Sequence, residues 1–268
     1  MKQVLSIQDL SCLGKCSLTV ALPILSAMGV CATALPTAVL STHTAFSDPV
    51  CHSFTGELVE IADHWKKNGA RFDFVSVGYL SDPVQAEAVE KVLERFDASV
   101  VIDPAMGDHG KLYRGMGDEN VQAMKRLCKK GNVLLPNLTE AALLTGLPYR
   151  EDPDESYYKE LLDGLMNFGV DGAVITGISW GENHTGFVGR YGETGDFSYK
   201  ASRIPRQSHG TGDMFCGVTT GSLAKGFSLQ GSAALAAQFV EQVMLATPQP
   251  TPFGANFEEV LPWLVKQL

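Results

Sequence analysis

A glycine-rich turn followed directly by an acid is the stretch of this sequence best suited to chemistry. Gly210, Thr211 and Gly212 precede Asp213, and the small and apolar residues that follow predict a helix. A turn of this kind at a helix start points several backbone N–H groups at one spot, where an anion such as a phosphoryl group binds. Asp213 could accept the proton of an attacking hydroxyl there. The alternative is a purely structural turn in which Asp213 caps the helix, since Asp is a favoured N-cap.

Four further polar residues each stand just after an apolar run that predicts a strand. They are Asp103, Asn137, Glu140 and Tyr79. If those strands are parallel, their carboxyl ends meet at one edge of a sheet, where ligands bind in folds of this class. Carboxylate and amide oxygens suit Mg²⁺. Taken singly, Asp103 before a proline is an ordinary turn and Asn137-x-x-Glu140 an ordinary helix cap, but their convergence on one edge favours metal-assisted phosphoryl transfer.

The elements that would position these residues alternate between short apolar runs and helix-length amphipathic stretches. This alternation predicts an α/β fold with a mostly parallel central sheet covered by helices on both faces. No linker or repeat interrupts it, so residues 1–268 are expected to form one domain. The expected strands are Val4–Ile7, Cys31–Leu35, Phe74–Val77, Val100–Ile102, Val133–Leu135, Ala173–Thr176 and Thr185–Val188, and the expected helices are Leu18–Met28, Phe54–Lys67, Pro83–Phe96, Asn120–Lys130, Thr139–Leu144, Glu155–Phe168, Gly212–Lys225, Leu229–Leu245 and Phe257–Lys266.

The composition narrows the set of partners. A formal net charge of -9 argues against binding to nucleic acid and to anionic membranes. An acidic protein that handles a nucleotide needs a divalent cation between its carboxylates and the phosphates. No apolar run approaches a membrane span, the N-terminal residues do not resemble a signal peptide, and the six cysteines show no metal or disulfide spacing. A cytoplasmic location with reduced thiols is therefore expected.

Two better-known phosphate-binding motifs are incomplete. The stretch ending near Lys15 looks like a Walker A loop, but Asp9 takes the place of its first glycine and Cys16 that of its metal-binding Ser or Thr. The turn at Gly210 begins like a dinucleotide fingerprint, but Phe215 occupies the third glycine position. The chain is therefore expected to be neither a P-loop ATPase nor a typical Rossmann protein.

Seven motifs occur in order along almost the whole chain: Leu5-Ser6-Ile7-Gln8, Leu35-Pro36-Thr37, Ser41-Thr42-His43-Thr44, Gly78-Tyr79-Leu80, Asp103-Pro104-x-Met106-Gly107-Asp108, Pro136-Asn137-x-x-Glu140 and Gly210-Thr211-Gly212-Asp213. Together they resemble the ribokinase-like superfamily, in particular its vitamin B6 (pyridoxal/pyridoxamine) kinases, with hydroxymethylpyrimidine kinases as near relatives. The last motif is common to the superfamily, and its combination with Ser-x-His-Thr is more specific. The resemblance implies a three-layer α/β/α sandwich that phosphorylates the hydroxymethyl group of a B6 vitamer with ATP and Mg²⁺.

The resemblance also implies a role for each residue of the turn and of the sheet edge. Asp213 would be the base that deprotonates the substrate hydroxymethyl group, and Gly210, Thr211 and Gly212 would form the anion hole for the γ-phosphate. A monovalent cation such as K⁺ beside the Mg²⁺, and a homodimer, are also in keeping with the resemblance. The remaining implied assignments are Mg²⁺ binding by Asp103 and Glu140, nucleotide binding by Asp108, Asn137, Thr176 and Thr211, and a mobile lid at residues 107–117.

On the substrate side, the resemblance assigns His43, Thr44 and Tyr79 to the pyridine pocket, and there the chain also departs from the family pattern. Asp9 stands where the B6 kinases have a serine. A carboxylate there could pair with a protonated ring nitrogen or an exocyclic amine, which would favour pyridoxamine or an aminopyrimidine; the alternative is a solvated loop residue. His209 before the turn is similar to many pyrimidine kinases. A hydroxymethylpyrimidine kinase is thus one alternative, and a vitamin-binding relative without catalysis is another.

Overall fold

The computed structural model describes residues 1–192, 195–206, 208–249 and 251–268. The strands in this part of the chain lie in one large sheet and one small hairpin. The strands of the large sheet are β1 (Gln3–Leu13), β2 (Cys31–Thr42), β3 (Cys51–Ser53), β4 (Phe74–Val77), β5 (Ser99–Ile102), β8 (Val133–Leu134), β9 (Gly172–Trp180), β10 (His184–Tyr191) and β11 (Asp196–Ser202), and those of the hairpin are β6 (Gly107–Asp108) and β7 (Lys111–Leu112).

The large sheet is mostly parallel, as the alternating pattern predicts. Its order is β11-β10-β9-β8-β5-β4-β1-β2-β3, and β1, β2, β4, β5, β8 and β9 pair in parallel. Strands β10 and β11 continue it antiparallel at one edge, and β3 pairs antiparallel to β2 at the other. The carboxyl ends of the parallel strands therefore share one edge of the sheet, which is the geometry that the clustering of Asp103, Asn137 and Tyr79 requires.

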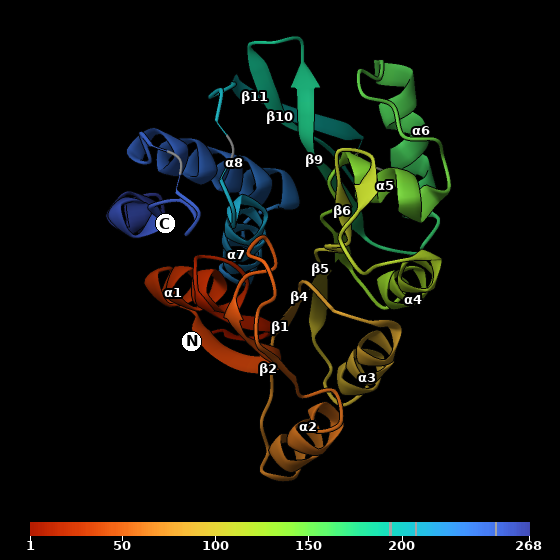
Figure 1. Cartoon of the computed structure of the whole chain (residues 1–268), viewed down its shortest axis with the longest axis vertical. Coiled ribbons are helices and arrows are strands. Elements are labelled where there is room, and N and C mark those ends of the chain that lie inside the picture. Colours follow the sequence, from red (N-terminus) through yellow and green to blue (C-terminus); the bar gives the residue numbers. More distant parts are fainter. Residues whose placement is uncertain (193–194, 207, 250) are drawn as a thin grey trace.

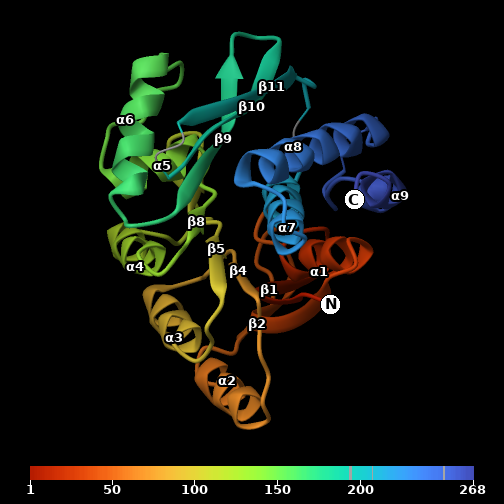
Figure 2. The same ribbon diagram turned by 180° about the vertical axis from the view of Figure 1, so that it is seen from behind.

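Helices cover both faces of this sheet (Figure 1), and the view from behind shows the same two layers (Figure 2). Helices α1, α7, α8 and α9 pack together on one face, while α2 to α6 form a row on the other. Within the described ranges, no helix is both long enough and apolar enough to cross a membrane. The helices are α1 (Leu18–Ala27), α2 (Leu58–Lys67), α3 (Pro83–Leu93), α4 (Asp118–Cys128), α5 (Leu138–Thr145), α6 (Glu155–Met166), α7 (Thr211–Ala224), α8 (Leu229–Ala246) and α9 (Leu261–Val265), with a 3₁₀ turn at Phe257–Val260.

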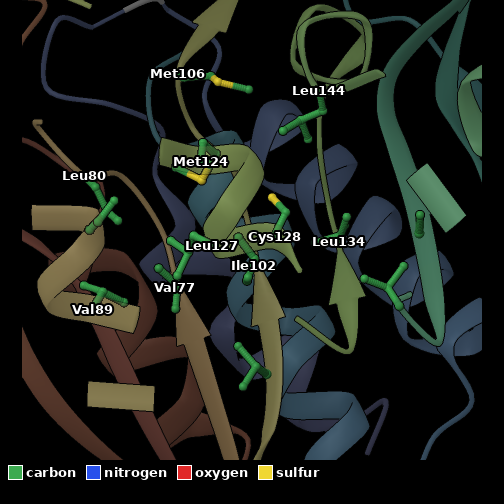
Figure 3. Close-up of a cluster of buried hydrophobic side chains, with 14 of the residues drawn as sticks. Val77, Leu80, Val89, Ile102, Met106, Met124, Leu127, Cys128, Leu134 and Leu144 are labelled. Atoms are coloured by element: carbon green, nitrogen blue, oxygen red, sulfur yellow. The ribbon is translucent and has the colours of Figure 1, made fainter. Parts of the chain in front are cut away.

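The central strands are apolar throughout because each contributes side chains to the hydrophobic cores on both faces of the sheet. In β5, Val101 packs in the core beneath α7, while Val100 and Ile102 pack in the core on the opposite face. Successive side chains of a strand point to opposite faces, so both sets must be apolar. Figure 3 shows the core on the face covered by α2 to α6, where Ile102 and Leu134 from neighbouring strands lie beneath the helices.

Several elements differ from the sequence-based expectation. The pattern of apolar runs does not predict the edge strands β3 and β11 or the β6–β7 hairpin. Strand β3 has three exposed residues, and in β11 apolar residues alternate with polar ones. The two hairpin strands have only two residues each. The helix expected over Phe54–Lys67 begins only at Leu58. The helix expected over Phe257–Lys266 is divided: Phe257–Val260 forms a 3₁₀ turn, and α9 starts afresh at Leu261 with a proline in its first turn.

Candidate active site

The glycine-rich turn has a backbone shape that only glycine adopts easily. Gly210 lies directly before α7 with a left-handed φ of 84°. A Cβ atom at this position would lie 2.1 Å from the backbone oxygen of Lys15, far inside van der Waals contact. A Cβ at Gly212 would meet only Asp103, with its Oδ2 at 3.8 Å. The turn thus packs against the loop between β1 and α1, and it brings the start of α7 next to Asp103.

Asp213 lies in the first turn of α7, and its side chain is partly buried. Burial, with a smaller contribution from the nearby charge of Asp9, raises its pKa to about 7, while a hydrogen bond from the backbone N–H of Ser17 opposes the rise. A carboxyl group with a pKa near neutrality is well matched to general-base catalysis, because it is both available as the anion and basic enough to take a proton. Asp213 is not the N-cap of α7, which is Gly210; its catalytic role stays a prediction.

Asn137 and Glu140 form a reciprocal cap at the start of α5. The Glu140 backbone N–H donates to Asn137 Oδ1 at 3.0 Å, and the Asn137 backbone N–H donates to Glu140 Oε2 at 2.8 Å. Glu140 Oε1 also accepts from the Met106 N–H at 3.0 Å, and Glu140 is 2% exposed. The helix-cap alternative for this pair is thus confirmed. Oε1 also accepts from the Gly107 N–H at 3.5 Å, so the lone pair that remains for a ligand is on Oε2, which accepts only from Asn137.

Three carboxyl groups crowd this edge of the sheet. Burial, together with the charges of Glu140 and Asp213, holds the pKa of Asp103 well above its usual range. Burial likewise raises the pKa of Glu140 to about 8. Among the residues that the structure describes, no three acidic, histidine or cysteine side chains form a ready-made metal cage. Mg²⁺ in phosphoryl-transfer sites commonly takes only one or two carboxylates and completes its shell with phosphate oxygens and water, so Asp103 and Glu140 fit this ion.

Binding of Mg²⁺ at these carboxyls is expected to release protons near neutral pH. Because the pKa of Glu140 is raised to about 8 and that of Asp103 is also raised, the metal-free protein holds protons here at pH 7. The cation favours the charged carboxylates and displaces those protons, so the affinity for Mg²⁺ should rise with pH up to about 8. Titration calorimetry in two buffers of different ionisation enthalpy measures the release. Buffer-independent heats would contradict it, and Asp103→Asn should reduce the release.

A cavity of about 910 Å³ opens beside the turn and the carboxyl groups. This volume lies within the usual size of small-molecule sites and is large enough for a nucleotide. Part of its wall is apolar, with Phe187 of β10 and Val240 and Met244 of α8. The cavity brings together nine residues singled out from the sequence, namely Asp103, Asp108, Asn137, Glu140, Thr176, Gly210, Thr211, Gly212 and Asp213.

The segment expected to act as a lid begins as the β6–β7 hairpin beside this cavity. The Asn137 side-chain amide donates to the Gly107 backbone oxygen at 2.8 Å, and the Gly110 N–H donates to Thr139 Oγ1 at 2.9 Å. Asp108 and Tyr113 line the cavity. The hairpin is thus docked on the start of α5, next to the carboxyl groups; its movement stays a prediction. Tyr113 lies within the expected lid segment, but sequence reasoning did not name it as an individual site residue.

The residues assigned to the substrate side do not line this cavity. His43 is 5% exposed: its Nδ1 accepts from the Ala45 N–H at 3.3 Å, which leaves Nε2 to donate to the Pro252 backbone oxygen at 2.7 Å. Thr44 is exposed at the surface. Burial raises the pKa of the Tyr79 phenol, and so does the nearby Asp9 carboxylate. His43 and Tyr79 therefore lie in the neighbourhood of Asp9, which in turn acts electrostatically on Asp213.

Asp9 is not the solvated loop residue that the sequence left open. It lies in β1 and is 4% exposed. Its Oδ2 accepts from the Ser11 hydroxyl at 2.9 Å, and its Oδ1 accepts from the Ser17 hydroxyl at 2.5 Å. Ser17 was missed as a site residue, because its position before a predicted helix indicates only an N-cap.

Lys15, the residue that makes the β1–α1 loop resemble a Walker A motif, is engaged by the C-terminal part of the chain. Its Nζ pairs with Glu258 Oε2 at 2.7 Å and Asn256 Oδ1 at 3.3 Å. Lys15→Met is therefore expected to leave the KM for ATP unchanged and to lower the free energy of unfolding by at most about 1 kcal/mol, as for other partly exposed ion pairs. Steady-state kinetics and thermal unfolding measure the two effects. A large rise in the KM for ATP would mean that the ammonium group reaches the phosphates after all.

The chain matches the phosphomethylpyrimidine kinase family over residues 22–257. It is 30% identical over 261 residues to the pyridoxine/pyridoxal/pyridoxamine kinase of Bordetella bronchiseptica, covering 91% of this chain and 89% of that one. The match to the corresponding Bordetella pertussis kinase is 35% identical and spans about half of each chain, 54%.

Two solved structures are similar over nearly the whole chain. One is a Bacteroides thetaiotaomicron protein proposed to be a phosphomethylpyrimidine kinase, 36% identical, with a TM-score of 0.94 and coverage of 98% of this chain and 93% of that one. The other is the pyridoxal kinase of Lactobacillus plantarum, 32% identical, with a TM-score of 0.92 and coverage of 100% and 98%. These likenesses agree with the resemblance drawn from the seven motifs.

Proposed function

Since this chain belongs to the phosphomethylpyrimidine kinase family of the ribokinase-like superfamily and is a phosphotransferase with an alcohol group as acceptor, we propose that it phosphorylates the 5'-hydroxymethyl group of a vitamin B6 vitamer with ATP. The observation that carries the proposal is Asp213, a carboxyl with a pKa of about 7 that directly follows the Gly210–Gly212 turn at the wall of a nucleotide-sized cavity. Three of the relatives described above, each at 30% identity or more, are named as kinases of this vitamin.

In the proposed mechanism the protein mainly positions the reacting groups and neutralises the charge of the phosphates. Asp213 accepts the proton of the substrate hydroxyl as that oxygen attacks the γ-phosphorus, and the bond from this phosphorus to the bridging oxygen breaks to release ADP. The backbone N–H groups of the Gly210–Gly212 turn hold the transferring phosphoryl group at the start of α7. Asp103 and Glu140 would hold Mg²⁺, which would neutralise phosphate charge when bound. The cavity wall excludes water, which would otherwise compete with the substrate hydroxyl.

The remaining site residues have narrower proposed roles. The nucleotide contacts are proposed for Asp108, Asn137, Thr176 and Thr211, all of which line the cavity. On the substrate side we propose Tyr79, Thr44 and His43 as ring contacts. Both ring nitrogens of His43 are already engaged by the backbone. A substrate contact by Asp9 stays a prediction.

A hydroxymethylpyrimidine kinase is the alternative within the same chemistry. The name of the family favours it, whereas a crystal form of the Bacteroides neighbour with pyridoxal favours the B6 assignment. A vitamin-binding protein without catalysis is the alternative of another class. The Asp213 carboxyl argues against this last function, because a protein that only binds has no need for a base with a near-neutral pKa beside an anion-binding turn.

The deciding experiment is ADP release with ATP and Mg²⁺ against pyridoxal, pyridoxine, pyridoxamine and hydroxymethylpyrimidine. Fast turnover of at least one B6 vitamer, with a higher kcat/KM than hydroxymethylpyrimidine, is the expected result. Preference for the aminopyrimidine would transfer the assignment to the thiamine precursor. Tight binding of a vitamer with no ADP formation would favour the non-catalytic function.

Three secondary features are also proposed. A homodimer is expected from the family resemblance, and sedimentation equilibrium tests it. Stimulation by K⁺ is tested by assays in which KCl replaces NaCl at constant ionic strength. We also propose that the protein is located in a reducing compartment such as the cytoplasm, since all six cysteines are free thiols.

A further inference from the structure

Ser17 occupies an unusual backbone conformation next to the proposed base. It is the N-cap of α1, yet its φ of 50° and ψ of −130° lie in a region that favours glycine. A serine at an N-cap normally accepts a hydrogen bond from the first turn, and Ser17 makes no such bond. Conformations of this kind persist only where the surroundings hold them, and they cluster at functional sites. Something other than helix capping therefore fixes this residue.

The two polar groups of Ser17 face two different aspartates. Its hydroxyl donates to Asp9 Oδ1 at 2.5 Å, and its backbone N–H lies close enough to the carboxylate of Asp213 to lower the pKa of that group. Both Asp9 and Ser17 are 4% exposed, so water does not compete for the hydroxyl bond. A short O–H···O⁻ bond of this length is typical of a charge-assisted pair. The strained backbone is thus anchored by Asp9 in an orientation that aims the N–H of Ser17 at Asp213.

Asp9 lies at an irregularity in the pairing of β1 with β2. Gln8 pairs with Pro36 and Leu10 with Val39, so Asp9 stands opposite a bulge in β2 that carries one extra residue. Such a bulge disrupts the ladder locally and increases the twist of the strand pair. Ser11 donates to the second carboxylate oxygen at 2.9 Å and fixes the carboxylate from the other side. Asp9 is thus held between two hydroxyls of its own chain.

The loop that carries Ser17 is also clamped against the catalytic turn. A Cβ at Gly210 would lie 2.1 Å from the backbone oxygen of Lys15, and a Cβ at Gly14 would lie 2.5 Å from Cδ2 of the His43 ring. The loop cannot shift far without moving the turn. A small change at the Ser17 anchor is therefore transmitted to Asp213.

We infer that Asp9 and Ser17 are positioning residues that orient the carboxylate of Asp213 through the Ser17 backbone N–H. This inference rests on the proposed function, in which Asp213 is the base. It differs from a substrate contact by Asp9, because it predicts an effect on kcat and none on vitamer binding. It also gives a role to the loop that looks like a Walker A motif but lacks its key residues.

The test compares Ser17→Ala with Ser17→Gly. Both remove the hydroxyl, but glycine adopts a positive φ without strain while alanine does not. We expect Ser17→Ala to lower kcat about tenfold to a hundredfold, the effect of losing one hydrogen bond to a charged group. We expect Ser17→Gly to lower kcat less than Ser17→Ala does. The KM for the vitamer should be unchanged in both variants. Asp9→Ala should match Ser17→Ala, and the double variant should be no slower than either, because all remove the same hydrogen bond.

Two controls separate positioning from general damage. Ser228→Ala removes an ordinary N-cap at α8, where the hydroxyl accepts from the Gly231 N–H, and should lower the Tm without lowering kcat. In an Asp213→Asn background, single-turnover measurements should show no further loss from Ser17→Ala, since the base is already absent.

Several outcomes would overturn the inference. A raised KM for the vitamer in Asp9→Ala, with Ser17→Ala unaffected, would make Asp9 a substrate ligand. A loss from Ser17→Ala that persists in the Asp213→Asn background would show a general structural effect. If Asp213→Asn turned over substrate as fast as the wild type, Asp213 would not be the base. If Asp213→Asn lost kcat as expected while Ser17→Ala and Asp9→Ala kept it, only the positioning role would be refuted.

Discussion

Replacement of Asp213 by asparagine is expected to lower kcat by about 10²–10⁴-fold, the range typical of a general base. The amide copies the shape of the protonated carboxyl, so it can still accept from the Ser17 N–H, but it cannot take a proton. The KM for ATP should change little, because Asp213 is one of many residues around the cavity. Initial rates of ADP release at saturating ATP and vitamer, with ATP binding followed separately, measure both effects.

The matched control is Asp154→Asn. Asp154 caps α6 by accepting from the Tyr157 N–H at 2.9 Å, far along the chain from the turn. The same chemical change there should lower stability slightly and leave kcat unaltered. A collapse of ATP affinity in Asp213→Asn with kcat preserved would mean that this carboxyl binds the nucleotide instead of activating the substrate.

The raised pKa of Asp213 gives the same variant a second, opposite effect on stability. The carboxyl has a pKa of about 7 in the folded protein against a usual value of 3.8, so the folded state binds this proton more tightly than the unfolded state. The stability it contributes is complete below about pH 4 and is lost as pH rises through 7. Asp213→Asn, which cannot ionise, should therefore have a higher Tm than the wild type at pH 8, and the gap should close towards pH 4. Thermal scans across this range measure it; a Tm gap independent of pH would contradict the raised pKa.

The fold and half of the site follow from patterns that are local in the sequence. The apolar runs before Asp103 and Asn137 predict buried parallel strands, and parallel strands must end at one edge. Asp103, Asn137, Glu140 and the Gly210–Asp213 turn therefore converge without further information. The antiparallel edge strand β11 could not be predicted in this way, because its outer position removes the continuous apolar run.

The remaining features depend on contacts between segments that the sequence does not connect. Asp9 looks solvated when read beside Ser11 and Lys15, yet it is buried in β1 opposite a bulge of β2 and accepts a hydrogen bond from Ser17. His43 looks like a free substrate ligand until Pro252 meets its Nε2, 209 positions away in the sequence. Such hydrogen bonds are set by tertiary packing, so the roles of these residues could not be settled from residue types and spacing.

The second large effect is expected from Gly210→Ala. The φ of 84° would be strained in alanine, and the new Cβ would lie 2.1 Å from the Lys15 backbone oxygen, an atom that cannot rotate away. The turn or the β1–α1 loop must therefore move. Either movement spoils the anion-binding N–H groups and the Ser17 contact to Asp213, so kcat should fall to near the background rate while the Tm also drops.

Gly226→Ala separates the two causes of this loss. Gly226 follows α7 with a similar φ of 92°, but a Cβ there would meet no atom within 4 Å. It should bear only the strain of a left-handed conformation, about 1–2 kcal/mol in stability, and keep full kcat. Gly210→Ala should be destabilised by more than this, because the clash adds to the strain. If the two variants proved equally stable and equally active, the packing of the turn against Lys15 would not be what holds the catalytic geometry, and the anion-binding role of the turn would have to be assigned elsewhere.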